Sequence, residues 1–203
     1  MPRSTPSVLL LTVALAISSA PASAQHLRAW GLKGAATLSS IQTELPSEDP
    51  EQRRGYSAFV FGEWAAAGPL SLVAEAGYLE RGYSRDASVA VDDRVFEHRL
   101  DKRFQYVSVA ALARVTAGTL GPVSPYVVAG PRMNALVGNR RGEGVPNYDY
   151  RPVVWDASIG AGMEARHAVL EVRYNVGLND ALQGEWGEPA YHRAVDFVLG
   201  WKF

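Results

Sequence analysis

The chain has no cysteine, no excess of charge of either sign and no long hydrophobic run beyond its first residues. The absence of cysteine excludes a disulfide framework, thiolate metal sites and cysteine nucleophiles. The 20 Lys and Arg residues balance 21 Asp and Glu residues, giving a formal net charge of -1, so nothing in the composition favours a nucleic acid partner. Only four histidines are present and none forms an i,i+4 pair, so we expect no metal site and no cofactor.

The first 24 residues have the pattern of a cleaved export signal. Arg3 supplies the positive end, residues 8–17 form a short apolar core, and Ala22-Ser23-Ala24 is a small-x-small cleavage site. The core is too short for a helix across a bilayer, which needs roughly 20 apolar residues. We therefore predict a signal peptide at residues 1–24 and one mature domain at residues 25–203, with a retained N-terminal anchor as the alternative.

Beyond residue 24, apolar and mixed positions alternate in short segments. In the last segment, every second residue from Val195 to Phe203 is apolar. Period-two alternation predicts strands whose two faces meet different environments. We predict eight strands, at residues 28–38, 56–65, 70–80, 104–116, 123–136, 155–163, 170–178 and 193–203.

The connections between these strands alternate in length. Long loops are predicted at residues 39–55, 81–103, 137–152 and 179–191, and short turns at 66–69, 117–122 and 167–168. This alternation puts both chain ends on the short-turn side. It is typical of an antiparallel up-and-down outer-membrane β-barrel, with short periplasmic turns and longer extracellular loops. The predicted fold class is therefore all-β, an eight-stranded transmembrane barrel.

Alternation alone does not decide whether the apolar face lines a soluble barrel or meets lipid. Aromatic residues cluster near both ends of this face, as in the girdles of membrane barrels. The short-turn side has Trp30, Trp64 and Trp201, and the loop side has Tyr56, Tyr78 and Trp155. The chain ends in the stripe Phe197, Leu199, Trp201 and Phe203, which has the form of the bacterial barrel-assembly signal. We therefore favour the membrane barrel, with a lipocalin-like soluble carrier as the alternative.

The opposite strand faces carry as many positive as negative residues. An eight-stranded barrel is just wide enough for side chains to fill, and charges in such an interior must be paired to offset their desolvation. We predict a lumen ion-pair network that closes the barrel, formed by Lys33, Glu63, Glu75, Arg114, Arg132, Asp156, Glu164, Arg166, Glu171, Arg173, Asp196 and Lys202.

Four parts of the mature chain carry a family resemblance. They are residues 30–36 (WGLKGAA), 106–110 with 126–131, 170–178 (LEVRYNVGL) and 199–203 (LGWKF). At these residues the chain resembles the porin-family, PorT-like outer-membrane β-barrel domain, an OmpA-like eight-stranded barrel. The resemblance implies a place in the outer membrane of a Gram-negative bacterium, and no particular activity.

Nothing in the sequence indicates catalysis, so we expect no enzyme. A barrel deacylase needs a His beside a Ser on one strand face, and none of His26, His98, His167 and His192 has one, so each is expected to be a solvated loop or interface residue. Acidic residues at 48–51 and 92–93 lack the spacing of a calcium loop. The tract at residues 142–146 is expected to be a turn, not a phosphate loop.

Three functional interpretations remain open. We favour a structural or surface-interaction barrel, expected to be a monomer, with outer-membrane lipid and the barrel-assembly machinery as its partners. The alternatives are a narrow pore or small-ligand-binding barrel, and a subunit of secretion or envelope machinery that would contact another envelope or extracellular protein.

Overall fold

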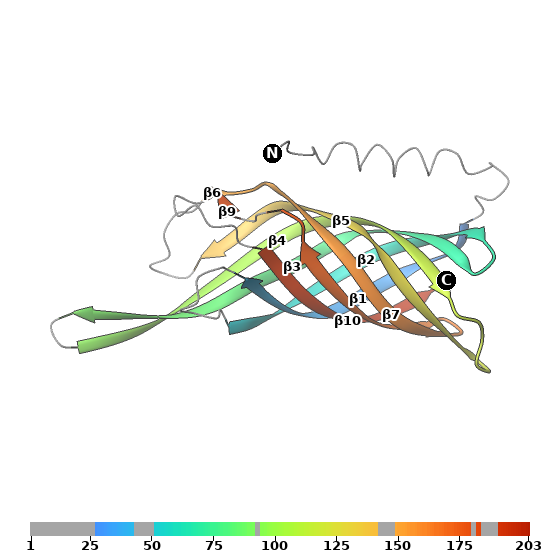
Figure 1. Cartoon of the computed structure of the whole chain (residues 1–203), viewed down its shortest axis with the longest axis horizontal. Coiled ribbons are helices and arrows are strands. Elements are labelled where there is room, and N and C mark those ends of the chain that lie inside the picture. The colour runs from blue at the N-terminus through green and yellow to red at the C-terminus, as the bar shows by residue number, and fades with distance from the viewer. Residues whose placement is uncertain (1–26, 43–50, 92–93, 142–148, 180–181, 184–190) are drawn as a thin grey trace, which may run out of the picture.

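A closed antiparallel barrel of eight strands makes up most of the structure, a computed structural model that describes residues 27–42, 51–91, 94–141, 149–179, 182–183 and 191–203 (Figure 1). The barrel strands are β1 (Leu27–Gln42), β2 (Glu51–Ala67), β3 (Leu70–Val91), β4 (Arg94–Thr116), β5 (Val123–Arg141), β7 (Val153–Ala165), β8 (Ala168–Gly177) and β10 (Tyr191–Lys202). A separate two-stranded sheet pairs β6 (Asp149–Tyr150) with β9 (Leu182–Gln183). The predicted all-β, eight-stranded barrel is confirmed.

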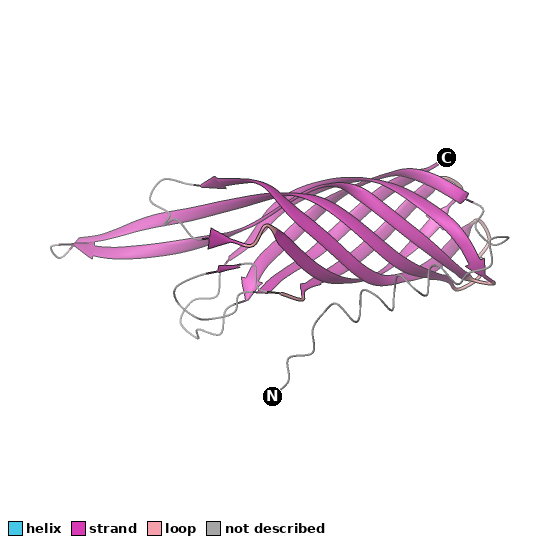
Figure 2. Cartoon of the chain, turned by 90° about the horizontal axis from the view of Figure 1, so that it is seen from above, coloured by secondary structure: helices cyan, strands magenta, loops and turns pink. Residues whose placement is uncertain are grey.

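Each barrel strand pairs with its neighbours along the chain, and the last strand closes on the first. Gly31 of β1 lies opposite Lys202 of β10, and Gln42 lies opposite Tyr191. The backbone N–H of Phe203 donates to the carbonyl of Trp30 at 2.8 Å, which continues this pairing to the end of the chain. The C-terminal end and the start of β1 therefore lie at the same end of the barrel as the short turns (Figures 1 and 2).

The two faces of each strand differ in exposure, with the apolar face outside. In β10, Phe197, Leu199 and Trp201 are 51–63% exposed, whereas Asp196 and Lys202 are almost fully buried. A soluble barrel has the reverse arrangement, because water favours polar residues on its outer face. The soluble lipocalin-like alternative is therefore wrong. No helix in the part of the chain that the structure describes is long and apolar enough to cross a membrane.

The strands are longer than the sequence indicated, and the segment predicted as a loop at 81–103 is largely strand. β3 and β4 stay paired from Arg81 opposite Phe104 to Val91 opposite Arg94. Beyond Ser84, β3 pairs only with β4, so the two strands form a ribbon that extends well past the barrel wall (Figure 2). A two-stranded ribbon outside a core needs no apolar stripe, so its charged composition looked like that of a loop.

The short turns end the strands, and with them the alternation of inward and outward side chains. Gly68, Gly118 and Gly121 have positive φ, which glycine adopts without steric cost. The turn between β7 and β8 lies at Arg166–His167, one residue earlier than predicted, and Arg166 itself has a φ of 53°. The predicted signal peptide, residues 1–24, lies outside the described residues and stays a prediction.

Candidate functional site

The barrel interior is occupied by interlocking charged side chains at three levels. At the middle level, Glu75 of β3 accepts hydrogen bonds from Lys33 Nζ at 2.7 Å, Arg132 Nη2 at 3.0 Å and both terminal nitrogens of Arg173, at 2.6 and 2.9 Å. Glu171 pairs with Lys33 at 3.3 Å and accepts from Arg173 Nε at 2.6 Å. All five side chains are at least 90% buried. Pairing of this density offsets the cost of removing the charges from water.

A second ion-pair group closes the short-turn end of the lumen. Arg114 of β4 donates to Glu63 of β2 at 3.0 Å and to Glu164 of β7 at 2.5 Å. Lys202 of β10 donates to the same two carboxylates, at 3.1 and 2.8 Å. Two buried cations and two anions therefore alternate around this end and their formal charges cancel, while the exposed Arg28 approaches Glu63 at 3.9 Å from outside the group.

At the loop end, the carboxylates have one cation and several neutral partners. Asp156 accepts from Arg81 Nη1 at 2.6 Å and from Asn134 Nδ2 at 2.7 Å. Asp196 accepts from Thr37 and Asn175, each at 2.8 Å. This level carries one formal positive charge against two negative ones, whereas the middle level carries three against two.

Aromatic rings pack against the lumen cations. The Arg114 guanidinium carbon lies 3.9 Å from the ring centre of Tyr126, and that of Arg132 lies 4.7 Å from the ring centre of Phe59. The Tyr126 hydroxyl donates to Glu171 at 3.0 Å. Gly162 makes room for this ring, because a Cβ there would lie 2.6 Å from the Tyr126 hydroxyl oxygen. The lumen is therefore packed with side chains rather than lined by them.

Nearly all of these ion pairs reach past the adjacent strand. Lys33–Glu75, Arg132–Glu75, Arg173–Glu75, Arg114–Glu63 and Lys202–Glu164 each join strands that are not neighbours in the barrel. Glu171–Arg173, within β8, is the exception among the middle-level pairs. Arg173 and Glu75 lie on opposite walls, and the other four pairs join strands that are two apart, so the network links the strands around the lumen and also across it.

The structure brings together all the predicted lumen residues except Arg166. Arg166 is exposed in the β7–β8 turn, so its assignment to the lumen is wrong. Arg81 belongs to the lumen, although the sequence placed it at the start of a loop. The signal that would have identified it is the alternation of inward residues along β3, which continues from Glu75 through Leu79 to Arg81.

His192 also differs from expectation. It is 2% exposed, faces the lumen and lies edge-on to Phe104 with ring centres 5.8 Å apart, so the expectation of a solvated or interface residue is wrong for it. His167 is in the turn as expected, where its ring stacks on Trp201 at 5.5 Å. The described residues include no cluster of three His, Cys, Asp or Glu side chains suited to a metal ion. The acidic segment at 48–50 and residues 92–93 and 142–146 lie outside the described residues.

The six predicted girdle residues all lie on the outward faces of their strands. Trp30 stacks on Phe203 with ring centres 4.6 Å apart at the short-turn end. Tyr56 and Tyr78 lie 6.0 Å apart towards the loop end. Trp201 is about half exposed, while Trp64 and Trp155 are partly buried against neighbouring side chains.

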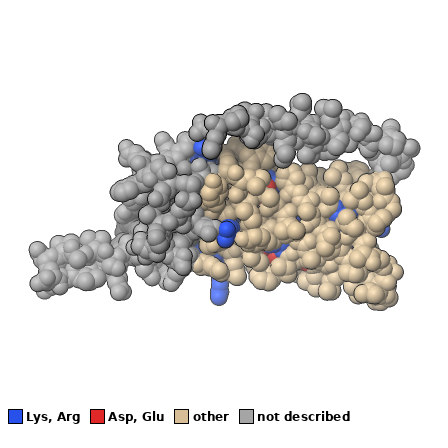
Figure 3. Space-filling view, in the orientation of Figure 1, with Lys and Arg blue, Asp and Glu red and all other residues tan. Residues whose placement is uncertain are grey.

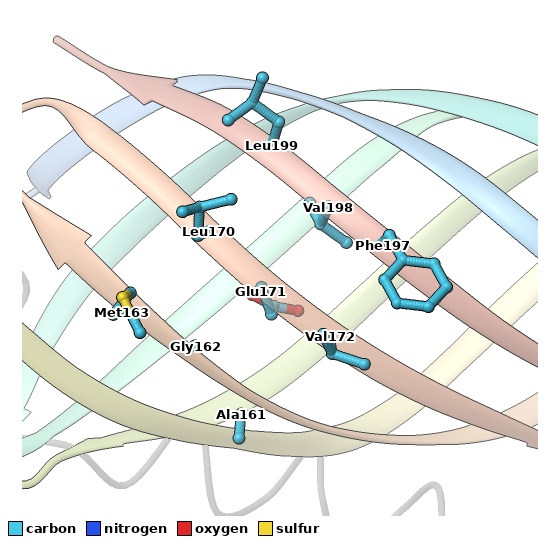
Figure 4. A pocket seen from close by; sticks show the side chains of 9 residues that line it. All are labelled: Ala161, Gly162, Met163, Leu170, Glu171, Val172, Phe197, Val198 and Leu199. Carbon is cyan, nitrogen blue, oxygen red and sulfur yellow. The ribbon is translucent and has the colours of Figure 1, made fainter.

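Between these two aromatic levels the outer wall is apolar. A shallow groove of about 360 Å³ runs across β7, β8 and β10 (Figure 4). Its outward side chains include Met163, Leu170, Val172, Phe197 and Leu199. Such a wall suits the acyl chains of a bilayer, and the strand pairing leaves no open sheet edge within it.

A closed eight-stranded barrel with an apolar outer wall and a charged interior defines an integral β-barrel of the bacterial outer membrane. The chain belongs to the family described as "Outer membrane protein beta-barrel domain", whose model matches residues 19–183. The predicted family resemblance and the predicted location in the outer membrane are thereby confirmed.

Solved structures show the same fold. Neisserial surface protein A has a TM-score of 0.51 and 13% sequence identity, with 86% of this chain and 97% of that chain covered. The outer membrane protein OprG from Pseudomonas aeruginosa has a TM-score of 0.52 and 12% identity, with 88% and 97% covered. At these identities the likeness concerns the fold alone. No curated protein sequence matches the chain.

Proposed function

We propose that the protein is a non-enzymatic surface barrel of the outer membrane whose lumen is closed to solutes. The observation that carries the proposal is the middle-level network, in which Glu75 of β3 binds cations from β1 and β5 on either side and from β8 on the opposite wall of the lumen. A solute passing this level would have to separate buried ion pairs, at a cost of roughly 3–5 kcal/mol for each pair broken.

Support for a role at the cell surface comes from the asymmetry of the two ends. One end has only short turns, and the other carries the β3–β4 ribbon and the long connections. In outer-membrane barrels the long connections face outward. The ribbon and loops are then the parts of the chain available to extracellular partners.

Absence of catalysis is part of the proposal. Of the described histidines, His167 is bonded to the Lys202 carbonyl at 2.9 Å, and His192 has no hydrogen-bond partner among the described residues. Neither has the Ser hydroxyl and orienting carboxylate that acyl transfer needs.

Planar-bilayer recording tests the closed lumen. The parent chain is expected to give no steady single-channel current. The double variant Glu75→Ser with Arg173→Ser removes the central charges and much side-chain volume, so it is expected to conduct. Both proteins are first checked for a folded barrel by gel migration. Steady conductance by the parent chain would contradict the closed lumen and favour a narrow pore.

A second candidate function, binding of a small polar ligand from the loop end, is favoured by one observation. Several buried polar atoms there have no hydrogen-bond partner among the described residues: Arg81 Nε and Nη2, Asn134 Oδ1, Asp156 Oδ1 and both ring nitrogens of His192. Ligand-dependent stabilisation that disappears in His192→Phe would support this candidate. Co-purification of a stoichiometric envelope protein would instead support a role in secretion or envelope machinery.

A further inference from the structure

Exposed charge on the described part of the barrel is of one sign. Every carboxylate whose side chain is described is buried or partly buried. The exposed charged side chains are all arginines: Arg28 and Arg166 at the short-turn end, and Arg54, Arg103 and Arg193 at the loop end. Figure 3 accordingly shows blue groups standing out on the barrel surface and only traces of red. Among the side chains that the structure describes, the negative charges are therefore enclosed and the exposed charges are positive.

Two of the loop-end arginines lie close together on the outer wall. Arg193 of β10 is opposite Ser40 of β1, and Arg54 of β2 is opposite Leu38 of the same strand. The two arginines therefore flank β1, with backbones two strand spacings apart across the sheet and two residues apart along β1, a separation of about 12 Å. Guanidinium groups on long side chains can converge on one ligand across that distance.

Within the part of the chain that the structure describes, these two arginines have no counter-charge. Arg103 has a carboxylate partner, because its Nη1 lies 4.0 Å from Glu80. Neither Arg54 nor Arg193 has an ion-pair partner among the described residues. A solvated arginine needs no partner, but these two lie beside the lipid-facing wall.

Their position along the strands is that of a lipid headgroup. Tyr56 follows Arg54 by two residues towards the bilayer, and Leu32 and Leu38 lie on the same outward face of β1. Tyrosines mark the interface between acyl chains and headgroups. Arg54 lies two residues beyond Tyr56 and Arg193 lies two residues inside the outward Tyr191, so both arginines are within this interfacial band. Phosphate is the anionic group found at that level, and the planar guanidinium binds it in a bidentate manner.

We propose that Arg54 and Arg193, flanking Ser40, form a binding site for the phosphate of a membrane lipid in the leaflet at the loop end. This inference goes beyond the proposed function and does not depend on a closed lumen. Its ligand is a phosphorylated lipid headgroup, held at the outer wall while its acyl chains lie against the apolar strands below.

Native mass spectrometry of the full mature chain in a non-ionic, phosphate-free detergent tests the site. The probes are phosphatidic acid and diacylglycerol with identical acyl chains, so that they differ only in the phosphate. The test variant is Arg54→Gln with Arg193→Gln. The matched control, Arg28→Gln with Arg166→Gln, removes the same charge from exposed positions at the opposite end.

The loop-end variant is expected to lose roughly tenfold or more in affinity for phosphatidic acid, since each arginine near an anionic surface contributes about 1 kcal/mol. The short-turn variant is expected to stay within about twofold of the parent, and diacylglycerol binding is expected to be equal in all three proteins. Equal losses in both variants would mean general attraction by net charge, and no loss in the loop-end variant would mean that no site exists there. Either result would overturn the proposal.

Discussion

Arg173 has the largest set of carboxylate contacts among the lumen cations. It holds both oxygens of Glu75 and also binds Glu171, while its side chain is 2% exposed. Arg173→Ala would leave these two carboxylates with Lys33 and Arg132 as their cationic partners. We expect the free energy of unfolding to fall by roughly 3–5 kcal/mol, measured by urea titration of the barrel in lipid vesicles.

Arg166→Ala is the control for that measurement, because it removes an arginine that is exposed in a turn. We expect it to change stability by less than about 0.5 kcal/mol. Arg173→Lys should lie between the two, since lysine keeps the charge but loses the bidentate contact. Small and equal effects for Arg173→Ala and Arg166→Ala would mean that water fills the lumen and that the network does not brace it.

For single residues, prediction from sequence was right where inward and outward side chains alternate strictly, and wrong where the strand ends. Glu171 and Arg173 lie well inside β8, so the alternation of inward and outward residues correctly predicted both in the lumen. Arg166 follows Glu164 by two residues, but the strand ends at Ala165 and the left-handed turn removes Arg166 from the inward face. The choice of partner for each charge was not predictable, because it depends on which strands face each other across the lumen.

At the scale of the element, β10 closes the barrel, because it pairs with β8 on one side and with β1 on the other. Its outward residues Phe197, Leu199, Trp201 and Phe203 are all more than half exposed, so they are available to lipid and to an assembly factor. We predict that deletion of Phe203 reduces membrane integration severalfold, because it removes the stack on Trp30 and the final backbone bond to β1 as well as a recognition element. The measurement is protease-protected, membrane-integrated protein at matched synthesis.

Leu120→Ala serves as the comparison for Phe203, since Leu120 is a 74% exposed apolar residue in a short turn at the same end. It should integrate as the parent chain does. If the Phe203 deletion also integrates normally, the C-terminal stripe is not an assembly signal.

The β3–β4 ribbon is expected to be dispensable for the barrel. The described backbone of residues 85–91 and 94–100 pairs only within the ribbon, so it adds no strand pairing to the closed wall. Replacing residues 86–99 with Asn-Gly, which favours a tight hairpin turn, should leave the thermal midpoint of unfolding within a few degrees of the parent, as judged by circular dichroism in vesicles. Failure of this variant to fold would show that the ribbon is needed to nucleate the β3–β4 pair.

Prediction from sequence was weakest for the lengths of β3 and β4. Inside the barrel each strand alternates between lipid and lumen, and that contrast is visible in the residues. Outside the membrane both faces of the ribbon meet water, so no contrast marks the strand and composition resembles a loop. Closure itself was predictable, because an open edge in lipid leaves backbone groups unsatisfied.

The whole molecule is expected to resist unfolding by detergent until it is heated. All eight strands are paired on both sides, so no edge is available at which the barrel would begin to open. The mature chain should migrate faster on a gel when kept at room temperature in dodecyl sulfate than after boiling, and should fractionate with outer membranes. Identical migration of both samples, with recovery as a soluble periplasmic monomer, would contradict the barrel in the membrane.

The crossing ion pairs have a consequence for folding kinetics. Lys33 and Glu171 are 138 residues apart in sequence and Arg173 and Glu75 are 98 apart, and both pairs lie between non-adjacent strands. Such contacts form late, because long stretches of chain must be ordered before the partners meet. An open, partly assembled sheet would hold these charges unpaired beside the bilayer, so it is a high-energy state. We therefore expect charge pairing and barrel closure to occur in one cooperative step, with no stable intermediate between the open sheet and the closed barrel.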